Sequence, residues 1–150
     1  MHKPTKSTIN IFIDKLDKSG IGASLIQNKD VYLVPFTLPG ETVKAKIVNK
    51  FRSKVYCSNL EILVNSSERS NNTCNHFTKC GGCLLQHWTY EKYKNWKFNL
   101  IKQPLLKLTP DIKILDMISA ENYSRRRAKF FLKQERNSCK IGFKEYKSDN

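Results

Sequence analysis

Three cysteines that lie within ten residues of one another, Cys74, Cys80 and Cys83, form the sharpest chemical signal in the sequence. Their spacing is C-x5-C-x2-C, and Gly81 and Gly82 fill the last interval. Glycine adopts backbone conformations that other residues avoid, so this pair permits the tight turn that converging thiolates need. Soft sulfur ligands select zinc or an iron–sulfur cluster. We therefore predict a metal centre in which these three cysteines are ligands.

The fourth ligand decides between the two kinds of centre. His87, four positions after Cys83, could complete a Cys3His zinc site, and so could His76. An iron–sulfur cluster normally needs a fourth thiolate, and Cys57 and Cys139 are the remaining cysteines. Cys57 falls in an alternating segment typical of a core strand, whereas Cys139 lies between two predicted strands. The spacing alone leaves zinc and iron–sulfur both open.

The chain as a whole is strongly basic. Its 150 residues include 27 Lys and Arg against 13 Asp and Glu, which gives a formal net charge of +14 and a sequence pI of about 9.7. No segment reaches the ~18 consecutive apolar residues of a membrane-spanning helix. The first residues also lack the apolar core of a secretory signal. We expect a cytoplasmic protein with an anionic partner and no membrane partner.

The first half predicts a small β-barrel. Ile9, Ile11 and Ile13 alternate with polar residues, the period of a half-buried strand. Similar segments follow, separated by turn residues such as Gly20 and Pro39-Gly40. The expected strands cover residues 7–17, 21–27, 31–34, 42–48 and 54–63. Five short strands in about 60 residues are typical of an OB-like barrel.

A set of cations falls on two adjacent predicted strands of this barrel and the turn between them. They are Lys44, Lys46, Lys50, Arg52 and Lys54. A basic face of this kind predicts a groove for nucleic acid, and the alternative is a solvated surface of a lysine-rich protein. Four aromatic residues could stack on bases, although each type is more often found in a core. They are Tyr32, Phe36, Phe51 and Tyr56.

The last third predicts one helix followed by strands. Apolar residues recur at helical spacing over 90–108, where Pro104 is expected to kink or end the helix early. The segments 111–118, 123–133 and 140–146 are expected to be strands. Within the second of these, Arg125, Arg127 and Lys129 are candidate RNA contacts, and alternation places Arg126 on the opposite face. A solvated or ion-paired surface is the alternative interpretation.

Taken together, these segments resemble the N-terminal part of the bacterial RNA uracil-5 methyltransferases, in the 23S ribosomal RNA branch. The resemblance runs from about residue 7 to residue 147. The matching stretches are IDKLDKSGIGA at 13–23, VPFTLPGETV at 34–43, SER at 67–69, CNHF at 74–77, CGGCLLQH at 80–87, YEKYKNWK at 90–97, YSRRRA at 123–128 and IGF at 141–143.

The resemblance implies an α+β fold in three parts. Residues 1–66 would form a TRAM domain, an OB-like five-stranded RNA-binding barrel, and residues 67–88 an iron–sulfur cluster loop. Residues 89–150 would be an incomplete central domain, with a helix and the start of a mixed sheet. Cys74, Cys80 and Cys83 would then be three ligands of a [4Fe-4S] cluster, and His87 a structural residue beside it. The implied partner is RNA, ribosomal RNA in particular.

The sequence departs from the family pattern in two ways, and these limit which family ligands and catalytic residues can be assigned to it. In the family, the fourth cluster cysteine follows the strand that corresponds to Ile141-Gly142-Phe143, at a position that would fall after Asn150 here. Cys139 precedes that strand and does not match the ligand position. The catalytic Rossmann-like domain, with its S-adenosylmethionine loop and nucleophilic cysteine, is also absent. No catalytic residue is therefore assigned, and methyl transfer would need a longer parent or a separate C-terminal chain. The alternative function is a free-standing, zinc-binding RNA-binding module without catalysis.

Overall fold

The computed structural model describes residues 7–26, 29–71, 74–120 and 124–148. The chain forms two compact units. The first comprises Met1–Thr73 with Leu84–Tyr90, and the second comprises Cys74–Cys83 with Glu91–Asn150. The strands between residues 8 and 64 belong to the first unit, while the cysteines at 74, 80 and 83 belong to the second.

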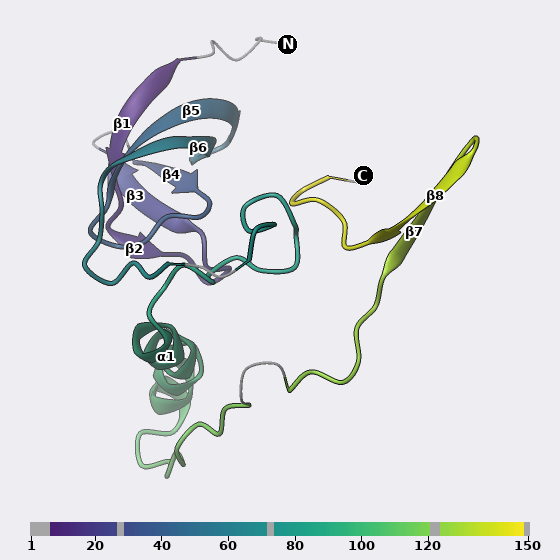
Figure 1. Cartoon of the computed structure of the whole chain (residues 1–150). Helices are drawn as coiled ribbons and strands as arrows, with labels where there is room; N and C mark the ends of the chain where they lie inside the picture. The colour runs from purple at the N-terminus through teal and green to yellow at the C-terminus, as the bar shows by residue number, and fades with distance from the viewer. Residues whose placement is uncertain (1–6, 27–28, 72–73, 121–123, 149–150) are drawn as a thin grey trace. The chain divides into compact units, whose positions relative to one another are not determined.

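One mixed six-stranded sheet makes up most of the first unit (Figure 1). Its strands are β1 (Thr8–Phe12), β2 (Lys15–Leu16), β3 (Gly22–Ile26), β4 (Asp30–Val34), β5 (Thr42–Phe51) and β6 (Lys54–Val64). Their order across the sheet is β1-β5-β6-β4-β3-β2. Neighbours are antiparallel except for β4 and β6, which run parallel.

The sheet curls because one stretch of chain supplies both of its edges. β1 pairs with β5 and β2 pairs with β3, although only Ile13 and Asp14 separate β1 from β2. At this bend the N–H of Ile13 donates to the carbonyl of Glu41 at 2.8 Å, and that of Asp14 to Ala23 at 3.0 Å. The prediction of one strand over 7–17 is therefore corrected to two strands, since a single straight strand could not pair at both edges.

Alternating apolar residues form the core of the curled sheet. Its buried members are Ile11, Ile13, Val34, Val43, Ala45, Val55 and Cys57. The predicted inward face of the first segment is confirmed, with Ile9 partly buried against this cluster. Cys57 is also confirmed as a core residue, and burial raises the pKa of its thiol to about 11. A thiol that resists ionisation in this way is a poor metal ligand.

The helix of the second unit, α1, spans Tyr90–Leu108, as the spacing predicts. Of the two effects expected of Pro104, a kink or an early end, the early end is wrong, because the helix continues to Leu108. Proline removes its own N–H donor and its ring crowds the carbonyl of the preceding turn, but the four residues after it remain helical. No residue of α1 is buried. In the described part of the chain, no helix has both the length and the apolar character needed to cross a membrane.

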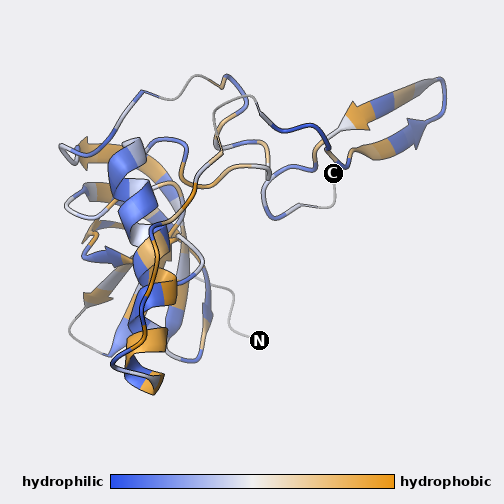
Figure 2. Ribbon diagram, turned by 90° about the horizontal axis from the view of Figure 1, so that it is seen from below, coloured by the Kyte–Doolittle hydropathy of each residue, from blue (hydrophilic) through white to orange (hydrophobic). Residues whose placement is uncertain are grey.

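The strand predictions after α1 needed more correction. Residues 111–118 form no strand, and Ile118 is 98% exposed. Tyr123, where the next strand was expected to begin, lies outside the described residues, and β7 covers only Phe131–Glu135. β8 is Ser138–Gly142 rather than 140–146. The two strands pair only with each other, in an antiparallel hairpin along which hydrophobic and hydrophilic residues are mixed (Figure 2).

These differences have one physical cause. A strand needs a hydrogen-bonding neighbour and a face to bury, and a two-stranded hairpin alone offers little of either. The expected start of a mixed central sheet is therefore not formed in the described residues, and the fold is mostly β with one helix rather than α+β. The described residues contain no Rossmann-like βαβ arrangement.

Candidate metal centre and RNA interface

The cysteine loop is shaped by short backbone hydrogen bonds. The N–H of Phe77 donates to the carbonyl of Cys74 at 3.1 Å, and the N–H of Cys80 donates to that of His76 at 2.8 Å. Thr78, between them, has a left-handed φ of 72°. These tight turns fold the interval between the first two cysteines back on itself.

The two glycines of the loop do not adopt the left-handed backbone that the sequence analysis expected, since neither Gly81 nor Gly82 has a positive φ. They matter instead through close approach of neighbouring atoms. The N–H of Gly82 donates to the Sγ of Cys80 at 3.3 Å, and a Cβ on Gly82 would lie 3.4 Å from that sulfur. A Cβ on Gly81 would lie 3.1 Å from the carbonyl oxygen of Lys144. Backbone donors to sulfur are also a means by which proteins tune iron–sulfur clusters.

A second segment of the same unit is tied to this loop. Gly81 donates its N–H to the carbonyl of Lys144 at 2.9 Å, and Tyr146 donates its N–H to Lys79 at 2.8 Å. Cys80 and Glu145 thereby form an antiparallel bridge. The chain that follows the Ile141-Gly142-Phe143 strand thus returns to the side of the loop that carries Cys80.

The cysteines themselves are accessible thiols. Cys74 and Cys80 are half-buried, Cys83 and Cys139 are exposed, and the described cysteines form no disulfide. Cys139 lies in β8, opposite Gln134. Among the residues that the structure describes, no three His, Cys, Asp or Glu side chains are gathered as a metal site. The fit to a metal centre therefore rests on the donor chemistry of the three thiols and on the fold of their loop.

His87, the candidate fourth zinc ligand, is fully buried in the first unit. Burial, and then the nearby charge of Arg69, lower the pKa of its imidazole to about 4. His87 is therefore neutral at pH 7, enclosed in a different unit from the three cysteines. His76 is exposed on the cysteine loop.

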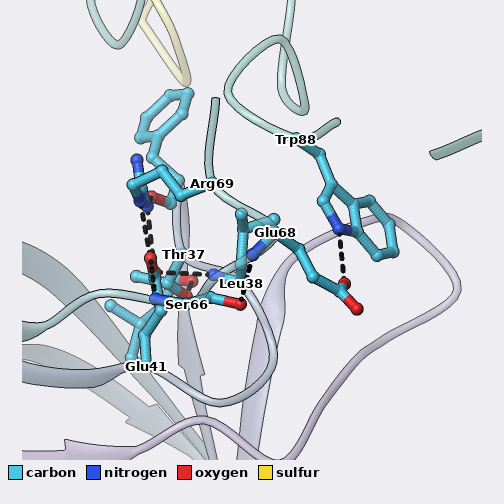
Figure 3. A network of polar contacts seen from close by, with 9 residues as sticks. Thr37, Leu38, Glu41, Ser66, Glu68, Arg69 and Trp88 are labelled. Carbon is cyan, nitrogen blue, oxygen red and sulfur yellow. Dashed lines mark hydrogen bonds and ion pairs between the residues drawn. The ribbon is translucent and has the colours of Figure 1, made fainter. Parts of the chain in front are cut away.

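The two sides of the cysteine loop are joined at its base by a short ladder within the first unit. Arg69 and Trp88 form an antiparallel bridge. Ser70 donates its N–H to the carbonyl of His87 at 2.9 Å, and Thr89 donates to that of Glu68 at 3.0 Å. The indole N–H of Trp88 also donates to the carboxylate of Glu68 at 2.9 Å, as Figure 3 shows.

Sequence reasoning assigned no role to Glu41 and Arg69, which anchor this ladder to the sheet (Figure 3). The guanidinium of Arg69 donates twice to the buried carboxylate of Glu41, at 2.5 Å from Nε and 2.9 Å from Nη2. Its Nη2 also donates to the carbonyl of Phe36 at 3.1 Å, and the N–H of Leu38 donates to Glu41 at 2.8 Å. The only signal in the sequence was that both residues fall in stretches that carry the family resemblance.

Burial would raise the pKa of Glu41, but its partners outweigh that effect. The hydrogen bond from Arg69, the N–H of Leu38 and the charge of Arg69 together hold this pKa below its usual value of 4.5. Glu41 is thus ionised and paired at neutral pH. A paired buried carboxylate of this kind is costly to leave without its cation.

Of the five cations predicted to form one basic face, the structure pairs some with the neighbouring strands and others with an acidic or aromatic side chain. Lys44 and Lys46 of β5 lie opposite Asn10 and Thr8 of β1, while Lys54 lies opposite Phe51. The ammonium of Lys50, by contrast, forms an ion pair with Asp30, which raises the pKa of Lys50. The guanidinium of Arg52 lies 5.3 Å from the ring centroid of Phe51.

The predicted cations near residue 126 lie outside any strand. Arg125, Arg127 and Lys129 are all exposed, in a segment that the structure leaves without strand pairing. The alternation that placed Arg126 on the opposite face is therefore wrong, because it requires a strand. The ammonium of Lys129 lies 6.0 Å from the ring centroid of Phe131.

Known proteins align with nearly the whole of this chain. An uncharacterized RNA methyltransferase of Brucella melitensis is 34% identical over 144 residues, which are 96% of this chain and 33% of that protein. An uncharacterized RNA methyltransferase of Clostridium tetani is 32% identical over 147 residues, 96% of this chain and 32% of that protein. The 23S rRNA (uracil(1939)-C(5))-methyltransferase of Shewanella denitrificans is 27% identical over 154 residues, 97% of this chain and 33% of that protein.

The chain thus spans about one third of the length of the curated relatives that it matches. No protein-family model matches it. The resemblance first carried by the cysteine loop and the barrel stretches is confirmed by these alignments. Over nearly its whole length, the chain corresponds to the N-terminal portion of the RNA methyltransferase family that includes the 23S rRNA uracil-C5 methyltransferases.

Proposed function

We propose that this chain is the RNA-binding and [4Fe-4S]-binding portion of an S-adenosylmethionine-dependent 23S rRNA uracil-5 methyltransferase. The observation that carries the proposal is the alignment of 97% of the chain with a 23S rRNA (uracil(1939)-C(5))-methyltransferase. In this proposal residues 1–66 are the TRAM barrel, 67–88 the cluster loop and 89–150 part of a central domain. The substrate of the whole protein would be ribosomal RNA.

The RNA-binding role is supported by charge and by the curled sheet. A net charge of +14 gives the electrostatic attraction that a polyanion requires. A small, curled, antiparallel-rich sheet with exposed cations on one face is the kind of surface that OB-like domains present to single strands. Lys44, Lys46 and Lys54 remain candidate contacts from the first unit, and Arg125, Arg127 and Lys129 from the second.

The cluster role is supported by the cysteine loop. Cys74, Cys80 and Cys83 would supply three thiolates, and a bound cluster would serve as a structural crosslink of the loop. The fourth ligand would be Cys139, which is exposed in a hairpin, or a cysteine from the remaining two thirds of the whole protein. Residues 144–146, whose backbone pairs with the loop, follow the strand after which the family's fourth cysteine is expected.

Methyl transfer to uridine C5 is proposed for the whole protein only. The chain covers about a third of its curated relatives, and none of its described residues is assigned a catalytic or S-adenosylmethionine-binding role. Those residues would come from the remaining two thirds, in the same polypeptide or in a separate C-terminal chain.

The salt dependence of RNA binding tests this proposal. We expect the chain to bind a fluorescein-labelled single-stranded ribosomal RNA oligonucleotide, with anisotropy as the measurement. If six phosphates are neutralised, the slope of log affinity against log salt concentration should be about −4. The absence of binding, or an affinity that salt does not change, would contradict the proposed RNA-binding role.

A further inference from the structure

We infer that the tip of the β5–β6 hairpin is a stacking platform for an unpaired RNA base, with Phe51 as the stacking residue. This inference rests on the proposed RNA-binding function and adds a contact residue and a substrate class to it. The ligand would be single-stranded RNA laid across the outer face of β5 and β6. Three observations carry the inference: a β-bulge, an exposed aromatic ring and the cations that share its face.

The bulge determines which side chains share the outer face. Ile47 lies opposite the buried Cys57 and points inward, but Asn49 lies opposite Tyr56, so Val48 is an extra residue without a partner. One extra residue reverses the alternation that follows it. Phe51 therefore lies on the outer face, with Lys54 as its cross-strand partner.

The same reversal turns Lys50 away from this face. Lys50 lies opposite the buried Val55, and its ammonium is paired with Asp30. Without the bulge, Lys50 would be on the outer face and Phe51 would point inward. The sequence-based grouping of all five cations on one surface therefore places Lys50 on the wrong side.

The ring of Phe51 is held open to solvent. It is 60% exposed, at the last position of β5 before a two-residue turn formed by Arg52 and Ser53. Arg52 adopts a left-handed φ of 54°, and its guanidinium lies 5.3 Å from the centroid of the Phe51 ring. The guanidinium lies over one face of the ring, and an exposed aromatic ring with a cation on one face is an arrangement that can stack a nucleobase on the other.

The cations of this face give it the charge that an RNA backbone requires. Lys46 and Lys44 continue the outer face of β5, where Lys46 lies opposite Ser58 and Lys44 lies opposite Glu61. Tyr56, half-buried beside Asn49, adds a second aromatic ring. The combination selects unpaired nucleotides, because the bases of a duplex are stacked within the helix and present no free face to an aromatic side chain.

The test compares Phe51 variants by fluorescence anisotropy with a labelled single-stranded RNA oligonucleotide. We expect F51A to weaken binding about tenfold and F51W to restore it. The salt slope should be unchanged in F51A, because no phosphate contact is lost. L25A is the matched control, since Leu25 is a 69% exposed apolar residue on β3, and it should bind as wild type does.

Two further readouts separate stacking from other roles. The fluorescence of F51W should be quenched when RNA binds, and an RNA duplex should compete more weakly than a single strand. K46Q and K54Q should each reduce the salt slope by about 0.7, whereas K50Q should leave it unchanged. Thermal unfolding of each variant shows that the fold is retained.

The outcomes distinguish this inference from the proposed function. If wild type binds no RNA, the proposed function fails. If wild type binds RNA with the expected salt slope but F51A binds equally well, the function stands and the stacking platform is overturned. Equal competition by duplex RNA would overturn it too.

Discussion

The bidentate pair between Glu41 and Arg69 shows how single residues fix the base of the cysteine loop. Glu41 is fully buried after the turn that ends at Gly40, and Arg69 reaches it from the segment that leads into the loop. A buried carboxylate needs such a partner, since desolvation otherwise favours its neutral form. The pair therefore couples the position of residues 66–70 to the stability of the curled sheet.

Replacing Arg69 should destabilise the first unit. R69A leaves the Glu41 carboxylate buried without its cation, and we expect a loss of about 3 kcal/mol in the free energy of unfolding. Urea unfolding followed by tryptophan fluorescence measures this change, because Trp88 lies in the same ladder. K140Q is the control: it breaks the exposed ion pair with Glu135 and should leave the unfolding midpoint unchanged. Equal midpoints for R69A and wild type would contradict the role given to this pair.

The free energy of unfolding should also decrease as the pH is lowered through the range between the unfolded and folded pKa values of His87. Burial and Arg69 lower the pKa of His87 from 6.5 to about 4 in the folded protein. Between these values the unfolded chain binds a proton that the folded chain does not, so stability falls as the pH falls from 6.5 to about 4. The expected loss is about 3 kcal/mol, at 1.36 kcal/mol per pKa unit.

Urea midpoints at several pH values test this expectation. The lowered pKa of Glu41 adds a further loss at lower pH, because that carboxylate must be protonated against its partners. H87Q should flatten the profile between pH 6.5 and 4.5, whatever its effect on stability at pH 7. A wild-type midpoint that is constant over this interval would show that His87 is not held neutral by the fold.

At the scale of elements, Gly22 determines how closely β3 approaches the turn after β4. A Cβ on Gly22 would lie 1.9 Å from the Oγ1 of Thr37 and 3.0 Å from the carbonyl of Val34. Thr37 is buried and donates to that same carbonyl at 2.8 Å. No larger residue fits without displacing this hydrogen bond.

The matched pair of glycine variants tests this packing. We expect G22A to destabilise the first unit by about 3 kcal/mol, the upper range for overpacking. G142A, in β8, should be close to neutral, because a Cβ there meets nothing within 4 Å. Thermal unfolding measures both variants. If they shift the midpoint equally, the close approach at Gly22 does not determine stability.

The elements also show what sequence patterns can and cannot predict. Alternation located the strands of the first unit because each buries one face, and helical spacing located α1. It failed for 111–118, where apolar residues such as Leu115 remain exposed without a neighbouring strand. Pairing depends on partners far along the chain, and a local pattern does not contain them.

The candidate site likewise has features that the sequence predicts and features that it does not. The clustering and glycine spacing of Cys74, Cys80 and Cys83 were visible in the sequence because they are local. The burial of His87 and the Glu41–Arg69 pair were not, since 28 residues separate Glu41 from Arg69. The β-bulge at Val48 was likewise invisible, because it is defined only by the register against β6.

At the scale of the whole molecule, charge, alignment and the cysteine loop support one account. The net charge of +14 suits a polyanionic partner. The alignments cover nearly all of this chain but about a third of each relative. The chain would therefore contribute RNA binding and a cluster, while methyl transfer would depend on the rest of the protein.

The metal content of the chain tests the central claim most directly. Wild type, C80S and C139S are purified anaerobically, and iron, sulfide, zinc and the visible spectrum are measured for each. The account predicts about four irons per wild-type chain with a broad absorption band at about 400 nm and the loss of both in C80S, while the iron content of C139S shows whether Cys139 is the fourth ligand. Stoichiometric zinc without iron, no metal at all, or full iron in C80S would contradict it.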